Sequence, residues 1–296
     1  MKKPVFTGAG VAIITPMYED GSINFDELGR IIEDQIARHT DAIIICGTTG
    51  ECSTMTDEEQ LAAIKFTVDT VNHRVPVIAG AGSNDTDHGC ALAAKSAECG
   101  ADALLLVTPY YNKTTQRGLV TMYNTIADAS TKPVILYNVP SRTGVSCTVQ
   151  TYQKLAEHPN IVGVKEASDD FDLIQDTLRL CPPDFTVWSG NDGSTTAITA
   201  LGGKGVISVA ANVAPREMHE LTRLCLENRF SEAGALQLKL HPLIRALFCE
   251  VNPIPVKAAM ELLGLCSGEL RLPLCGISER HLEQLAQAMN AFGASA

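Results

Sequence analysis

The chain contains eight short and almost continuously apolar runs, with longer polar and amphipathic segments between them. Runs of this kind are typical of strands that are covered on both faces, as in a parallel sheet with helices on either side. We expect strands at residues 10–16, 41–47, 75–80, 103–109, 133–138, 161–167, 185–190 and 205–210.

The segments between these runs carry start and stop signals for helices. Thr56 and Glu59 have the spacing of a capping box, Gly100 stands where a helix would end, and Pro215 suits a first helical turn. Eight strand–helix units in this rhythm predict an α/β protein with a (β/α)8 TIM barrel. An open doubly wound sheet is the alternative. Such a sheet usually has a glycine fingerprint after its first strand, whereas GAGVA stands before the strand expected here.

After Asn228 the strand pattern stops. Three helical segments follow without apolar strands between them. We therefore expect a catalytic barrel at residues 1–229 and a C-terminal helical region at residues 230–296. The helical region would pack on the barrel or extend a contact between subunits.

Composition and charge exclude several classes of partner. The chain has 296 residues, 45% of them apolar and 19% charged, and its formal charge is −11 without any basic tract. This balance argues against nucleic acid or an anionic membrane as a partner. No apolar stretch reaches the length of a membrane span, and the first residues lack a secretory signal pattern. Ten scattered cysteines without a CxxC pair indicate reduced thiols in a cytoplasmic protein, and no metal site is expected.

One lysine stands at an unusual place, where the buried strand IVGVKEA meets a polar loop. Active sites of such barrels lie at the C-terminal ends of the strands. Alternation puts Ile161, Gly163 and Lys165 on one face, and if that face is inward, Gly163 leaves space for a ligand or a neighbouring side chain. Partial desolvation lowers the pKa of a lysine ammonium, and the neutral amine that results can attack a carbonyl to form a Schiff base. The alternative is a structural lysine paired with Glu166 or Asp169.

Other strand ends carry polar groups that suit the same chemistry. Tyr137 ends the preceding strand, so its phenol can lie beside Lys165 and move protons, although it could instead pack against a helix. Thr48 and Thr49 in GTTGE could hold a small carboxylate, or form a plain turn. Arg142 could bind a second carboxylate in a bidentate manner, or be a surface arginine.

Four motifs, GTTGE, TPYYNK, YNVPSRTG and IVGVKEAS, together resemble the pyruvate-dependent class I lyase and aldolase family. The resemblance extends along essentially the whole chain. It implies a lyase of lysine and diaminopimelate biosynthesis that uses no metal or organic cofactor and is commonly a homotetramer, built as a dimer of dimers. It also implies that Lys165 forms a Schiff base with pyruvate. The resulting enamine attacks the aldehyde of L-aspartate-4-semialdehyde, and the adduct cyclises with release of the enzyme amine.

The resemblance also assigns roles to individual residues. It implies a proton relay of Tyr137, Thr48 and Tyr111, in which Tyr111 reaches the site of a partner subunit. Arg142 matches an arginine that recruits the carboxylate of the semialdehyde. Three residues match positions that hold or line the pyruvate carboxylate: Thr49, Gly190 and Ile207.

Two motifs distinguish the branches of this family. Sialic acid lyases typically have a serine within GSTGE and lack the arginine, whereas this chain has GTTGE and SRTG. The sequence therefore favours a synthase over another pyruvate-dependent aldolase, such as an N-acetylneuraminate or keto-sugar acid lyase. A non-catalytic barrel that binds a keto acid is disfavoured, because the lysine and the whole relay are present.

One departure from the family pattern concerns regulation. Lysine-inhibited members resemble one another at an effector site in the dimer cleft, which has histidines after GTTGE and an acid on the following unit. Asn84 and Tyr110 agree with that pattern, but Asp57, Gln60 and His88 do not. We therefore expect free lysine to inhibit this protein weakly or not at all.

Overall fold

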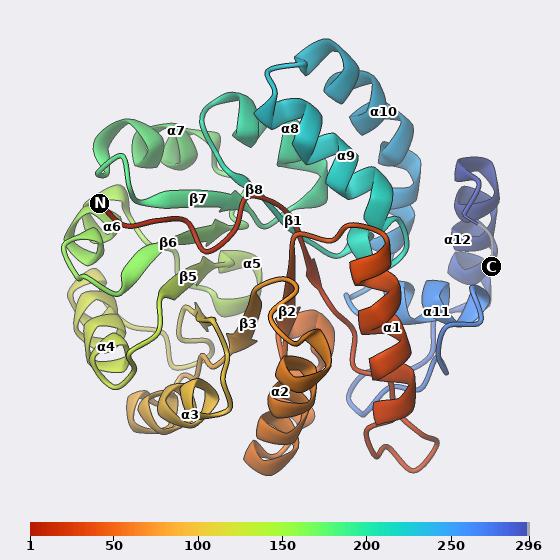
Figure 1. Cartoon of the computed structure of the whole chain (residues 1–296), viewed down its shortest axis with the longest axis horizontal. Helices are drawn as coiled ribbons and strands as arrows, with labels where there is room; N and C mark the ends of the chain where they lie inside the picture. The colour runs from red at the N-terminus through yellow and green to blue at the C-terminus, as the bar shows by residue number, and fades with distance from the viewer. Residues whose placement is uncertain (295–296) are drawn as a thin grey trace.

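The computed structural model describes residues 1–294 and forms a closed barrel of eight parallel strands (Figure 1). Each strand pairs with the next along the chain, and the first closes on the last. The predicted (β/α)8 topology is therefore confirmed. The strands are β1 (Gly8–Ala12), β2 (Ala42–Ile45), β3 (Val77–Gly80), β4 (Ala103–Val107), β5 (Val134–Asn138), β6 (Ile161–Glu166), β7 (Thr186–Ser189) and β8 (Gly205–Ser208).

Helices surround the barrel, and the last three follow one another without strands (Figure 1). The predicted capping box at the start of α2 is present, with Thr56 and Glu59 each accepting from the other's backbone N–H. The helices are α1 (Phe25–Ala37), α2 (Asp57–Val71), α3 (Thr86–Glu98), α4 (Gln116–Asp128), α5 (Pro140–Thr143), α6 (Val149–Ala156), α7 (Phe171–Leu180), α8 (Thr195–Ala200), α9 (Pro215–Leu226), α10 (Phe230–Leu247), α11 (Ile254–Leu262) and α12 (Glu279–Phe292).

The C-terminal helices pack on the barrel. Helix α10 contacts α8 and α9, and α12 packs against α10 and α11. Whether residues 230–296 form a unit of their own stays a prediction. Within residues 1–294, no helix is both long enough and apolar enough to cross a membrane.

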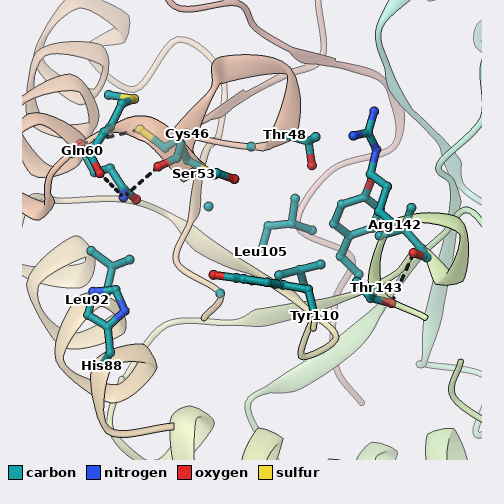
Figure 2. Close-up of a pocket in the computed structure, with 18 of the residues that line it drawn as sticks. Cys46, Thr48, Ser53, Gln60, His88, Leu92, Leu105, Tyr110, Arg142 and Thr143 are labelled. Carbon is teal, nitrogen blue, oxygen red and sulfur yellow. Dashed lines mark hydrogen bonds between the residues drawn. The ribbon is translucent and has the colours of Figure 1, made fainter. Parts of the chain in front are cut away.

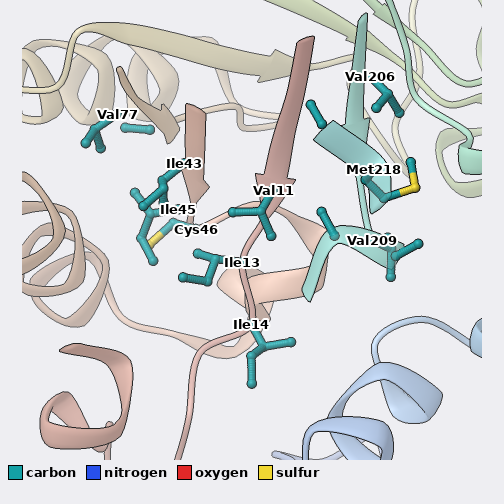
Figure 3. Packing of buried hydrophobic residues seen from close by; sticks show 14 of the residues in the cluster. Val11, Ile13, Ile14, Ile43, Ile45, Cys46, Val77, Val206, Val209 and Met218 are labelled. Carbon is teal, nitrogen blue, oxygen red and sulfur yellow. The ribbon is translucent and has the colours of Figure 1, made fainter. Parts of the chain in front are cut away.

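Apolar side chains divide between two clusters, as alternation along the strands requires. The larger cluster lies between the strands and the helices, and Figure 3 shows Val11, Ile43 and Val206 within it. The smaller cluster fills the barrel interior. There the ring of Phe6, which precedes β1, stacks on the fully buried Trp188 with centroids 5.3 Å apart. The barrel interior is thus packed with side chains, and functional sites of such barrels form at the C-terminal ends of the strands.

The first strand differs from its prediction. It spans Gly8–Ala12, so GAGVA is the strand itself and does not precede it. Pairing with β8 begins at Gly8, and a Cβ on Gly10 would lie 2.7 Å from Ile44 and 2.9 Å from Phe6. Glycine here makes room for side chains inside the barrel, a role that a search for strand-forming residues misses. Ile13 and Ile14 beyond the strand are buried, which explains why the apolar run continues.

A fully buried ion pair ties the C-terminal region to the loop after β2. Lys257 of α11 donates from Nζ to Oε1 of Glu51 at 2.6 Å, and the two side chains are 0% and 1% exposed. The ammonium also donates to the backbone carbonyl of Glu269, and Arg271 N donates to Oε2 of Glu51 at 3.2 Å. These contacts offset the cost of removing both charges from water.

We predict that Lys257→Met lowers the free energy of unfolding by about 3–5 kcal/mol, because it leaves the Glu51 carboxylate buried without its counter-charge. Denaturant unfolding measures this change. The matched control is Lys65→Met, which removes an exposed ion pair with Asp69 on α2, the side chains being 55% and 59% exposed. That substitution should cost less than about 1 kcal/mol. Equal effects of the two substitutions would contradict the prediction.

Candidate active site

Lys165 and Tyr137 lie side by side at the C-terminal ends of neighbouring strands. They are directly paired in the β5–β6 register. The Nζ atom of Lys165 lies over the Tyr137 ring, 4.2 Å from its centroid, and the residues are only 6% and 8% exposed. The amine and the phenol thus share one partly desolvated environment at the rim of the barrel.

The alternative interpretation of Lys165, as half of a structural ion pair, does not match the structure. Within residues 1–294, no carboxylate lies within ion-pair distance of its ammonium. Glu166 accepts hydrogen bonds from Tyr152 Oη at 2.6 Å and from Asn138 Nδ2 at 2.9 Å. Asp169 accepts from side chains in the loop after β7. Burial raises the pKa of the Glu166 carboxyl, and these hydrogen bonds oppose that shift.

The alternation predicted for β6 is wrong at its start. A register shift against β5 places Val162 with the cluster inside the barrel, while Ile161 packs in the outer cluster, not on the face of Lys165. Nor is the space beside Gly163 free for a ligand. A Cβ there would lie 2.0 Å from the carbonyl oxygen of Thr186 on β7. The glycine instead allows the β6 and β7 backbones to approach each other.

The GTTGE segment after β2 forms a short 3-10 helix, η1 (Thr48–Gly50). Thr15 Oγ1 donates to Gly50 O at 2.8 Å, which fixes the turn against the segment after β1. Thr48 lines the cavity described below, whereas Thr49 is only 3% exposed. The Oγ1 atom of Thr49 accepts a hydrogen bond from Asn252 Nδ2 at 3.1 Å.

Arg142 belongs to the short helix α5 at the rim of the barrel, and its side chain is exposed. Figure 2 shows it at the same end of the cavity as Thr48. Its Nη2 donates to the backbone carbonyl of Asn252 at 3.0 Å. No carboxylate of residues 1–294 is within ion-pair distance of this guanidinium, so most of its donors remain available to an anionic ligand.

A cavity of about 390 Å³ opens at this end of the barrel. One end is lined by Thr48 and Arg142, and the other by Gln60 of α2 and by His88 and Leu92 of α3 (Figure 2). Tyr137 also lines the cavity. Lys165 is not among the lining residues, but its Nζ lies over the ring of Tyr137, which is. The volume is within the range of small-molecule sites.

The far end of the cavity holds the residues that depart from the lysine-inhibited pattern. His88 Nε2 lies 2.8 Å from Asp57 Oδ1, and its Nδ1 lies 3.0 Å from Ser83 Oγ. Gln60 donates through Nε2 to the carbonyl oxygen of Cys52 at 3.2 Å. Burial raises the pKa of the Cys52 thiol to about 11, so it remains protonated at neutral pH. His88 thus links Asp57 to Ser83, while Gln60 is bound to the backbone of Cys52.

Three further predicted residues lie outside the cavity lining. Ile207 is fully buried inside the barrel. Gly190 donates its N–H to Glu166 O at 2.7 Å, and a Cβ on it would lie 2.6 Å from Ala167. Tyr111 is 92% exposed and has a left-handed backbone with φ of 68°. Within one chain, the structure does not bring Tyr111 to the other relay residues.

Two polar residues at the site were missed by the sequence interpretation. Asn252, described above, lies between α10 and α11, where no strand pattern pointed to a site. The second is Asp192 after β7, which is 2% exposed and accepts from Ser208 Oγ and from the N–H groups of Val209 and Ala210. Burial raises the pKa of Asp192, while these hydrogen bonds and the nearby charge of Lys165 oppose the rise.

Known proteins resemble this chain along almost its whole length. Residues 5–292 match the model of the dihydrodipicolinate synthetase family. A 4-hydroxy-tetrahydrodipicolinate synthase from Acetivibrio thermocellus is 54% identical, with 99% of each chain covered. The crystal structure of dihydrodipicolinate synthase from Aquifex aeolicus has a TM-score of 0.96 at 45% identity, covering 98% of this chain and 99% of that one.

A further solved structure contains a small ligand. It is the chloride-inhibited dihydrodipicolinate synthase from Acinetobacter baumannii complexed with pyruvate, with a TM-score of 0.96 at 42% identity, covering 97% of this chain and 99% of that one. Fold, motif order and full-length similarity all lead to one assignment. The chain belongs to the dihydrodipicolinate synthetase family.

Proposed function

We propose that the chain acts as a 4-hydroxy-tetrahydrodipicolinate synthase, a Schiff-base-forming lyase that joins pyruvate to L-aspartate-4-semialdehyde in lysine and diaminopimelate biosynthesis. The observation that carries the proposal is the placement of Lys165. Its amine is buried at a strand end, lacks a carboxylate partner among residues 1–294, and lies 4.2 Å from the centre of a tyrosine ring. A lysine in this environment is suited to covalent catalysis on a carbonyl.

The reaction begins when the Lys165 amine attacks the keto carbon of pyruvate, and loss of water from the carbinolamine gives an imine. Removal of a methyl proton converts the imine into an enamine, whose carbon attacks the aldehyde of the semialdehyde. The amino group of the joined semialdehyde then attacks the imine carbon, and this ring closure releases Lys165. Tyr137, beside the amine, moves protons to and from these intermediates.

Two groups recognise the substrates' carboxylates. Thr49 holds that of pyruvate, with Gly190 and Ile207 forming the surrounding wall, whereas the neighbouring Thr48 belongs to the proton relay. Arg142 binds the carboxylate of the semialdehyde. Support for this role is its position at the cavity rim with most guanidinium donors unused among residues 1–294.

The relay is completed by a second copy of the chain. Tyr111 projects from a turn in which Asn112 N donates to Tyr110 O at 2.9 Å and Asn112 Nδ2 donates to Asn84 O at 2.9 Å. The turn is ordered by these bonds while the tyrosine stays 92% exposed. We infer that Tyr111 enters the site of a partner subunit, within a cytoplasmic homotetramer built as a dimer of dimers.

Reductive trapping tests the Schiff base directly. Pyruvate followed by borohydride should give a covalent adduct at Lys165, because borohydride reduces an imine to a stable amine. Peptide mass spectrometry locates the adduct. Lys257 serves as an internal control, since it is also buried but ion-paired. A wild-type protein that gains no mass with pyruvate would favour the non-catalytic barrel, and turnover of N-acetylneuraminate but not of aspartate semialdehyde would favour the aldolase alternative.

Replacement of the guanidinium should separate the two substrates. We expect Arg142→Ala to lower kcat/KM for the semialdehyde about 10- to 100-fold, since it removes charge-assisted hydrogen bonds to a carboxylate. Trapping with pyruvate alone should be unchanged. Steady-state kinetics measures the first effect. If the variant lost imine formation as well, Arg142 would act on the fold or on pyruvate and not on the aldehyde.

Free lysine should not inhibit at submillimolar concentration. At the far end of the cavity, His88 is already hydrogen-bonded to Asp57, and Gln60 donates to a backbone carbonyl. The inhibited pattern has histidines where this chain has Asp57 and Gln60, and an acid where it has His88. Initial-rate assays with added lysine measure this. The matched variant is D57H/Q60H/H88E, which should gain sensitivity to lysine. A submillimolar inhibition constant for the wild-type protein would overturn the prediction.

A further inference from the structure

One residue outside the barrel contacts both proposed substrate-binding groups. Asn252 lies between α10 and α11 and is 7% exposed. Its side-chain amide donates to Thr49 Oγ1 at 3.1 Å, and its backbone carbonyl accepts from Arg142 Nη2 at 3.0 Å. We propose that Asn252 is a positioning residue that sets the direction of the Thr49 hydroxyl and the placement of Arg142. This inference rests on the proposed function of those two residues.

The hydrogen bond from Asn252 constrains the Thr49 hydroxyl. A hydroxyl has one hydrogen to donate and two lone pairs with which to accept. Because the amide occupies a lone pair, the O–H bond of Thr49 must point away from Asn252. Thr49 Oγ1 donates no hydrogen bond to another group of residues 1–294. The hydrogen is therefore available to a carboxylate oxygen, as the proposed role at pyruvate requires.

The backbone carbonyl of Asn252 acts on the second group. Arg142 is exposed, and an exposed arginine side chain loses much conformational freedom when it binds a ligand. A fixed acceptor for one of its N–H groups holds the guanidinium at the cavity rim before the ligand arrives. The remaining donors face no carboxylate among residues 1–294 and stay free for the substrate.

Neighbouring contacts keep Asn252 rigid. Ile254 N donates to Val251 O at 2.9 Å across the turn, and Lys257 N donates to Pro253 O at 3.0 Å as α11 begins. The side chain of that same Lys257 pairs with Glu51, two residues after Thr49. One short segment thus holds the loop after β2 at two points.

The remaining amide oxygen indicates that packing alone does not explain this residue. Asn252 Oδ1 is buried and has no hydrogen-bond partner among residues 1–294. An unpartnered buried acceptor is unfavourable, and an apolar side chain of similar size would avoid it. A function for the N–H donor explains why an amide occupies this position.

The test is a double-mutant cycle on pyruvate affinity. Asn252→Ala keeps the backbone carbonyl for Arg142 and removes only the amide. We expect the KM for pyruvate to rise about 3- to 10-fold, with less than about a twofold change in the KM for the semialdehyde. In a Thr49→Val background, which lacks the hydroxyl, Asn252→Ala should raise the pyruvate KM no further. If the two substitutions raised the pyruvate KM by independent factors that multiply in the double variant, the inference would be overturned.

A matched variant separates positioning from stability. Asn160→Ala removes a similar amide near the opposite end of the barrel, where Nδ2 donates to Ala127 O and Ser130 O, and it should leave both KM values unchanged. If Asn252→Ala does not fold, the isosteric Asn252→Asp replaces it. Its carboxylate would capture the Thr49 hydrogen, so the pyruvate KM should rise at least as much, and an unchanged KM would refute the inference.

Trapping with borohydride distinguishes this inference from the proposed function. If wild-type protein forms the pyruvate adduct and Asn252→Ala requires several-fold more pyruvate for half-maximal labelling, the inference is supported. If wild-type protein labels and the variant needs the same pyruvate concentration, this inference alone fails. If wild-type protein does not label at all, the proposed function fails and the role of Asn252 with it.

Discussion

The chemistry proposed for this protein depends on one register relation, the direct pairing of Lys165 with Tyr137 across β5 and β6. Because side chains alternate along a strand, a slip of one residue would turn the lysine out of the barrel. Two features prevent that slip. Gly163 allows β7 to approach where any other residue would collide with the backbone of Thr186. On the opposite face, Glu166 accepts hydrogen bonds from Tyr152 and from the side-chain amide of Asn138 on β5.

The C-terminal helices contribute directly to the site, although they lie outside the repeating strand–helix pattern. A buried ion pair such as Lys257 with Glu51 is rarely the most stable way to fill a core, because apolar side chains avoid the desolvation of two charges. The pair instead fixes the orientation of the turn after β2. Glu51 ends the turn that carries Thr48 and Thr49, and it has a left-handed backbone with φ of 58°. Fixing its carboxylate from α11 fixes where that turn points.

The fold could be predicted from the sequence because each strand is covered on both faces and therefore consists of a run of apolar residues. Consecutive strands of such a barrel pair, so Tyr137 and Lys165 could also be predicted as neighbours. The first strand was predicted at residues 10–16 and not at Gly8–Ala12, because its glycines are not counted as apolar strand residues. Asn252 could not be predicted from the sequence, because it lies 110 positions from Arg142. Its contact with Arg142 uses the backbone carbonyl, which every residue type has. The role of Gly163 was missed for a similar reason, since backbone approach depends on the neighbouring strand.

The two ends of the cavity differ in how their polar groups are satisfied, and this difference indicates where a ligand binds without penalty. At the end that holds Thr48, Arg142 has unused donors among residues 1–294. At the far end, both ring nitrogens of His88 have partners and Gln60 donates to a backbone carbonyl. A ligand that needs the His88 ring nitrogens or the Gln60 N–H groups must replace such contacts, each contributing about 0.5–1.5 kcal/mol, before it gains its own. The same cavity therefore has a guanidinium with unused donors at one end and a paired imidazole and carboxylate at the other.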